Sequence, residues 1–164
     1  MMQKWEERPF EIAYNLNPAY CTVLLHASIY GYQKKKKEGM PYPIIFLILP
    51  LIIYKPIRDR LPYKNTNQEI SLWLKENLEI LVDFDIKVRE LVPYTKETLM
   101  FAMQENVINI SKETGNLINI KKSLKIDWNE HSTPIDCKRK AKVLGKWFST
   151  LSVETIYANF RIRP

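Results

Sequence analysis

The chain has 164 residues, of which 46% are hydrophobic and 12% aromatic, enough for one packed domain and too many for intrinsic disorder. Lysine and arginine outnumber aspartate and glutamate by 25 to 18, and the resulting net charge of +7 favours polyanionic or acidic partners. The four glycines are too widely spaced for a glycine-rich phosphate loop or a dinucleotide fingerprint, which disfavours nucleotide binding by this chain.

The cysteines and the apolar runs indicate the environment of the protein. Cys21 and Cys137 are far apart in sequence and fall in amphipathic segments, so both are predicted to be reduced core residues. No secretory signal is visible near the N-terminus, and the longest apolar run, 43–54, is about half the ~20 residues that cross a bilayer. We therefore expect a cytoplasmic protein with no membrane partner and no cofactor.

In chain order, the first predicted element is a helix from Pro18 to about Lys37, with Asn17 as its N-cap. Gly39 is expected to stop it, and residues 40–43 are expected to be extended because two of them precede prolines. Residues 44–54 are apolar all round, which predicts a buried helix bent at Pro50, with a buried strand as the alternative. A short helix or turn with two exposed arginines should lie between the prolines at 56 and 62.

The next apolar seam predicts one long helix over about 66–91, or two helices broken near Leu78. Thr66 and Glu69 have capping-box spacing at its start. Pro93 is expected to end this helical region, and Thr95 is expected to cap a further helix through about Glu105.

Two β-prone runs, 107–110 and 117–120, predict a β-hairpin. Helix, turn, helix and hairpin is the order of a winged-helix unit, so residues 66–122 could form one. A loop over 121–132, a long helix opened by Thr133 and a short helix capped by Ser152 should follow. The predicted fold is one mainly α domain (α+β) over 1–164, with a winged-helix-like centre, one β-hairpin and helical extensions at both ends.

The sequence contains no catalytic constellation that we can recognise. His26 and His131 lie outside any metal or nucleophile motif, and Cys137 falls on an apolar helix face. Acidic pairs such as Asp83 and Asp85 lie on opposing faces of a helix. We therefore predict that the protein is not an enzyme.

The strongest charge signal is a run of five cations within nine residues, with no acid among them: Lys138, Arg139, Lys140, Lys142 and Lys146. Three of these, at 138, 142 and 146, form one helix stripe opposite the apolar seam, which could contact nucleic acid, an acidic protein surface or only solvent. Lys121 and Lys122 would lie on the predicted wing, where winged helices touch a duplex.

Ten short segments, taken in order, resemble a known family: 5–9, 11–13, 15–21, 39–43, 46–51, 55–58, 73–77, 144–148, 156–157 and 163–164. The chain resembles the middle-component family of bacterial three-component ABC systems, the small third subunit of Lamassu-type anti-phage defence operons. This resemblance implies a non-catalytic accessory role beside an SMC- or Rad50-like ABC ATPase and an effector, often nuclease- or protease-like, with double-stranded DNA as a further candidate partner.

Within those segments, aromatic and cationic side chains are the best candidates for partner contacts, because such residues dominate interface energetics. They are Trp5, Arg8, Tyr42, Lys55 and Arg58. The alternative for Trp5 and Tyr42 is that they complete the core of this domain. The alternative for the whole chain is a stand-alone winged-helix DNA-binding regulator.

Overall fold

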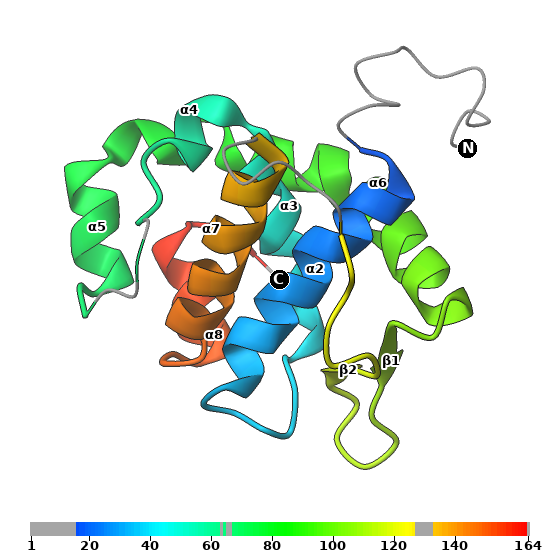
Figure 1. Cartoon of the computed structure of the whole chain (residues 1–164). Helices are drawn as coiled ribbons and strands as arrows, with labels where there is room; N and C mark the ends of the chain where they lie inside the picture. The colour runs from blue at the N-terminus through cyan, green and yellow to red at the C-terminus, as the bar shows by residue number, and fades with distance from the viewer. Residues whose placement is uncertain (1–15, 63, 65–66, 127–132, 164) are drawn as a thin grey trace.

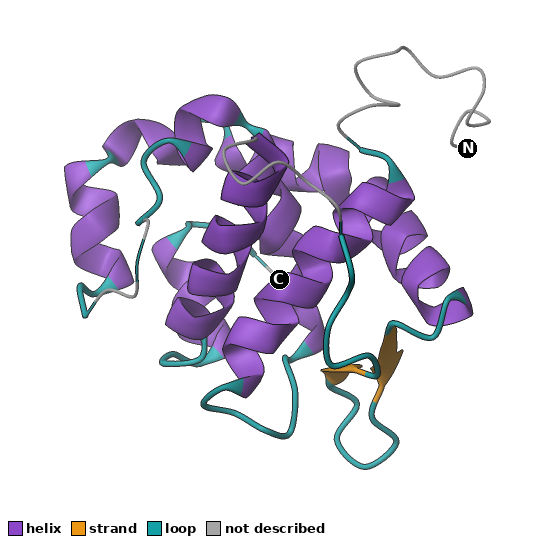
Figure 2. Cartoon of the chain, in the orientation of Figure 1, coloured by secondary structure: helices purple, strands orange, loops and turns teal. Residues whose placement is uncertain are grey.

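The computed structural model describes residues 16–62, 64, 67–126 and 133–163. These residues form a mainly helical structure with a single two-stranded hairpin, as predicted (Figures 1 and 2). The elements are α2 (Pro18–Gln33), η2 (Tyr42–Ile44), α3 (Ile45–Ile53), α4 (Lys55–Arg58), α5 (Ile70–Glu76), η3 (Leu78–Leu81), α6 (Phe84–Gln104), β1 (Ile108–Ile110), β2 (Leu117–Asn119), α7 (Thr133–Phe148) and α8 (Val153–Asn159), where η denotes a 3-10 helix.

Two helix starts follow the predicted capping chemistry. The side chain of Asn17 accepts a hydrogen bond from the backbone N–H of Ala19 at 2.8 Å, and the side chain of Ser152 accepts one from Thr155 at 3.1 Å. Each cap satisfies a backbone donor that the first helical turn leaves without a partner. The starts of α2 and α8 are therefore confirmed.

Helices α2 and α7 cross with their backbones in direct contact. A Cβ atom added to Gly145 would lie 1.8 Å from the carbonyl oxygen of Ser28, and one added to Gly31 would lie 2.0 Å from that of Lys142. Only hydrogen fits at these two positions, so the two glycines set the distance between the helices. Helices α3 and α6 also pack against α2 (Figure 1).

The core is densely apolar around α3 and is closed by aromatic rings from distant parts of the chain. The apolar run at 44–54 forms the helix α3, as predicted, and not the alternative strand. Most residues of α3 are fully buried. The ring of Phe160 lies 5.1 Å from that of Phe84 and 6.1 Å from that of Phe148, measured between centroids. These three rings join α6, α7 and the turn after α8.

The prediction that Pro93 ends a helix is wrong. Helix α6 continues through Pro93 to Gln104, and Thr95, the predicted cap, is buried inside it. Proline removes one backbone hydrogen bond and disfavours helix in the residue before it. Packing of α6 against α2 and α3 outweighs that local cost, and the proline ring itself is exposed to solvent.

Three other boundaries differ from the predictions. Helix α2 ends at Gln33, so the four lysines at 34–37 follow it in a turn. Tyr42 and Pro43 belong to η2, although the chain was expected to be extended there. The predicted capping box required Glu69 to be the third residue of the helix, but Glu69 is the N-cap of α5. Thr66, the other residue of that box, lies outside the described residues.

The break near Leu78 is confirmed: α5 ends at Glu76, and η3 separates it from α6. The hairpin is also confirmed, with Ile108 opposite Asn119 and Ile110 opposite Leu117. Leu117 forms a further antiparallel bridge with Met40, which fastens the hairpin to the segment before η2. The winged-helix description of 66–122 stays a prediction.

Candidate functional site

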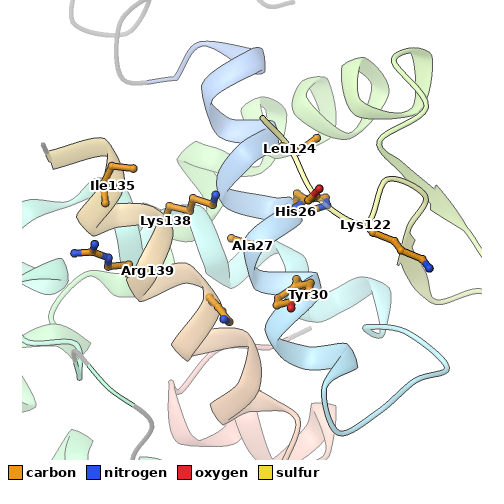
Figure 3. A pocket seen from close by; sticks show the side chains of 10 residues that line it. His26, Ala27, Tyr30, Lys122, Leu124, Ile135, Lys138 and Arg139 are labelled. Atoms are coloured by element: carbon orange, nitrogen blue, oxygen red, sulfur yellow. The ribbon is translucent and has the colours of Figure 1, made fainter. Parts of the chain in front are cut away.

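A groove of about 400 Å³ lies between α2, α7 and the segment that follows β2 (Figure 3). Helix α2 supplies its floor, and the other two elements supply its sides. The lining combines apolar, aromatic and cationic side chains with no carboxylate: His26, Ala27, Tyr30, Lys122, Ser123, Leu124, Ile135, Lys138, Arg139 and Lys142. Its volume falls within the range of small-molecule sites, about 300 to 1,000 Å³.

The cations of the groove come from two segments far apart in sequence. Lys138 and Lys142 are four residues apart on α7 and so share one face of that helix, next to α2. Figure 3 shows Lys138 extending toward α2, whereas Lys122 and Arg139 extend outward from opposite rims. Among the described residues, none of these four cations forms an ion pair. The groove therefore carries uncompensated positive charge.

Tyr30 holds two lysine ammonium groups at one end of the groove. The Nζ atom of Lys34 lies 4.4 Å from the centroid of the Tyr30 ring, and that of Lys142 lies 5.1 Å from it. The hydrogen bond with Lys34 and the charge of that lysine lower the pKa of the Tyr30 phenol. Cation–π attraction thus positions Lys142 at the groove.

His26 is a buried histidine whose side chain makes a hydrogen bond within the chain. Its side chain is buried, and its Nε2 atom lies 2.7 Å from the carbonyl oxygen of Lys121, to which it donates as the neutral ring. Burial lowers the pKa of His26, and the charge of Lys138 lowers it further. The amide of Asn119 donates to the carbonyl oxygen of His26 at 2.9 Å. These contacts fix the segment after β2 onto α2.

Acidification below about pH 6.5 is expected to destabilise the protein through His26. The unfolded chain takes up a proton near the ordinary pKa of 6.5, whereas burial and Lys138 resist protonation in the folded state. The contribution of this residue to stability is therefore complete above pH 6.5 and is lost as the pH falls toward the lower folded pKa. Urea unfolding of the wild type and His26→Gln between about pH 5 and 8 measures it.

Glutamine keeps a donor for the carbonyl oxygen of Lys121 but does not titrate, so it separates protonation from loss of the contact. The free energy of unfolding of His26→Gln should depend less on pH than that of the wild type over this range. Equal pH dependence in both proteins would contradict the assignment.

The structure brings together four of the seven basic residues singled out in the sequence: Lys122, Lys138, Arg139 and Lys142. Lys121 is exposed beside them and contributes its backbone carbonyl to His26, and Lys146 is half-buried farther along α7, outside the lining. Lys140 departs from the basic run because its side chain is 5% exposed. Its Nζ donates to the carbonyl oxygen of Arg58 at 2.9 Å and lies 3.5 Å from the carboxylate of Asp136.

The expectation that Arg58 is exposed is wrong. Its side chain is buried, and its Nη1 atom donates to the carbonyl oxygens of Ile52 at 2.9 Å and Ile53 at 3.3 Å. The last carbonyls of a helix have no partner within the helix, and the guanidinium supplies one at the end of α3. The guanidinium of Arg58 therefore makes its contacts within the chain.

Two of the other predicted partner contacts, Tyr42 and Lys55, are accessible to solvent. Tyr42 is 38% exposed and packs edge-on against Phe46, with 5.1 Å between ring centroids. Lys55 is exposed and pairs with Asp59 one helical turn away. Trp5 and Arg8 lie outside the described residues.

Sequence reasoning did not identify the apolar part of the groove, which consists of Ala27, Leu124 and Ile135. No local pattern places Leu124 beside α2, because that contact depends on the path of the chain after the hairpin. A signal for the neighbouring helix crossing was available in Gly31 and Gly145. Glycine inside a helix is unfavourable unless packing requires it.

In the part of the chain that the structure describes, metal-ligand side chains do not cluster and both cysteines are buried. No group of three His, Cys, Asp or Glu side chains there could hold a metal ion. Cys21 and Cys137 are buried and not joined in a disulfide, and burial raises the pKa of the Cys21 thiol to about 12. Within the same ranges, every helix is too short or too polar to cross a membrane.

Comparison with known proteins gives one clear match. No curated protein and no solved structure matches the chain. The family described as ABC-three component (ABC-3C) system Middle Component 3 matches residues 5–164, nearly the whole chain. The resemblance to the middle-component family of three-component ABC systems is thereby confirmed. The chain belongs to the Middle Component 3 family of ABC-three component systems.

Proposed function

We propose that this chain is a non-catalytic, cytoplasmic accessory subunit of a Lamassu-type anti-phage and anti-plasmid defence complex. It bridges an SMC- or Rad50-like ABC ATPase and a nuclease- or protease-like effector, and it contacts double-stranded DNA. The family match over residues 5–164 carries this proposal, because a middle component works as one part of a multi-component system. Nucleotide hydrolysis and cleavage then belong to the partners, and this subunit supplies interfaces.

A set of exposed apolar side chains supports contact with a protein partner. Leu78 in η3, Val82 in the turn after it and Ile86 in the first turn of α6 are 55%, 62% and 44% exposed. Large exposed apolar side chains close together in sequence favour a protein interface. We propose that this set, the 78–86 apolar set, contacts a protein component of the complex.

The basic groove supports contact with DNA and lies on different elements from the 78–86 apolar set. A subunit that bridges partners needs separate surfaces for each of them. Lysines and arginines without carboxylate partners can neutralise phosphates and release the counterions condensed on DNA.

The test is size-exclusion chromatography with mass determination of the subunit co-expressed with its operon neighbours. We expect the wild type to elute with a large ATPase and an effector. Val82→Asp combined with Ile86→Asp should release the subunit, because burying two carboxylates at an apolar interface is unfavourable. Met100→Asp is the matched control, since Met100 is 64% exposed on α6 outside the 78–86 apolar set.

A second variant, Lys138→Glu with Lys142→Glu and Lys146→Glu, locates the basic stripe. If the triple variant stays in the complex, these three lysines are available to DNA. If the triple variant is released from the complex, they belong to a protein interface. A wild-type chain that elutes alone at low and moderate salt would contradict the accessory role. It would favour the stand-alone DNA-binding regulator.

A further inference from the structure

We infer that the groove between α2 and α7 binds one unpaired nucleotide, with its phosphate at the cations and its base against the apolar wall. The inference rests on the proposed contact with DNA and narrows it: at this groove the ligand is an unpaired nucleotide of DNA and not an intact duplex. Phosphate recognition here depends on side chains, so the lack of a glycine-rich loop does not oppose it.

The charge of the groove favours a phosphate-bearing ligand. Lys138 reaches toward α2 within the groove, and Tyr30 holds Lys142 beside it. Lys122 and Arg139 extend outward at opposite rims, where the neighbouring phosphates of a strand would pass. This distribution, with cations inside the groove and at both rims, fits a unit of a strand better than an isolated anion.

The apolar lining distinguishes a nucleotide from other anions. Ala27, Leu124 and Ile135 offer a surface that can cover a base, whereas a carboxylate side chain of a protein partner would leave it uncovered. In an intact duplex the bases are stacked inside the helix, and only the phosphates of the backbone face outward. An unpaired nucleotide can therefore use the cations and the apolar wall together, whereas an intact duplex cannot.

The groove is also fixed in position before any ligand binds. His26 holds the backbone at Lys121 at 2.7 Å, Asn119 holds the backbone of His26, and the glycine crossing sets α7 against α2. A preformed site binds more tightly because less conformational entropy is lost on binding.

The experiment measures binding of the full chain to a labelled single-stranded oligothymidine and to a labelled blunt duplex of equal length, by fluorescence anisotropy at several salt concentrations. We expect tighter binding to the single strand. Lys138→Glu with Lys142→Glu should weaken that binding by at least about tenfold. Lys75→Glu and Lys96→Glu, at exposed lysines on α5 and α6, are the charge-matched controls and should change it little.

Leu124→Ser tests the apolar wall. It should weaken binding to the single strand and leave the dependence on salt unchanged, because it removes no cation. Circular dichroism verifies that each variant is folded, and Leu124→Ala replaces Leu124→Ser if that variant does not fold.

Competition with free thymidine monophosphate separates two sources of the same ligand. Displacement shows that a free nucleotide suffices, and its absence shows that the strand is required; both support the inference.

Three results would overturn the inference. The first is equal affinity for the single strand and the duplex, with no effect of the Leu124 variants. The second is displacement of the labelled strand by oligoglutamate as effectively as by unlabelled oligothymidine. The third is no binding of the chain to the single strand. Failure here is distinguishable from failure of the accessory role. A chain that joins the ATPase complex but fails this test loses only the nucleotide site, and a chain that binds the strand but elutes alone loses only the accessory role.

Discussion

Gly145→Ala is expected to destabilise the protein by about 3 kcal/mol, although alanine favours helix more than glycine by about 1 kcal/mol. The new Cβ would lie 1.8 Å from the carbonyl oxygen of Ser28, which is backbone and cannot rotate away. Helices α2 and α7 would have to separate, and the apolar contacts along their crossing would loosen. Gly31→Ala should act similarly, because its Cβ would lie 2.0 Å from the carbonyl oxygen of Lys142. Urea unfolding measures both effects.

Gly115→Ala is the matched control for this prediction. Nothing lies within 4 Å of the position that its Cβ would occupy, but its φ of +74° is unfavourable for alanine. We expect a cost of about 1 kcal/mol, from the backbone alone. If the two helical variants were no less stable than Gly115→Ala, the close approach of α2 and α7 would be wrong.

Phe160→Ala is expected to cost about 3 to 5 kcal/mol, comparable to the loss of other fully buried aromatic residues. The ring is 2% exposed and contacts both Phe84 and Phe148. Its removal leaves a cavity between two helices that cannot close without moving α6 toward α7. Thermal and urea unfolding of the variant measure this effect.

Phe160→Leu retains much of the side-chain volume and should lose clearly less stability than the alanine variant. Phe101→Ala supplies a second comparison, because Phe101 is only half-buried on α6. Equal losses for Phe160→Ala and Phe101→Ala would indicate that the residues after α8 are not part of the cooperative core.

The starts of α2 and α8 could be predicted from the sequence, whereas the continuation of α6 through Pro93 could not. Asn17 and Ser152 act through their own side chains on the adjacent turn, so their effect can be read locally. Pro93 opposes helix by the same local criteria, yet α6 continues, because contacts with α2 and α3 hold the flanking residues. Tertiary packing is not visible in a local pattern.

The candidate site also has a part that could be predicted from the sequence and a part that could not. The cations on α7 could be predicted because they lie close together in sequence, and their approach to Lys122 and Leu124 could not, because it depends on the path after β2. Arg58 was assigned to the surface by residue type, although the free carbonyls at the end of α3 draw it inward. Residue type alone does not distinguish a contact with a partner from a contact within the chain.

The burial of Arg58 and Lys140 changes how the charge of the protein should be counted. Both side chains are occupied by backbone carbonyls inside the fold, so neither is presented to an approaching polyanion. The number of ions displaced on association should therefore be lower than the total of 25 lysines and arginines suggests. The overall excess of +7 sets the long-range attraction of the molecule, whereas the positions at which its cations emerge determine its close contacts with a polyanion.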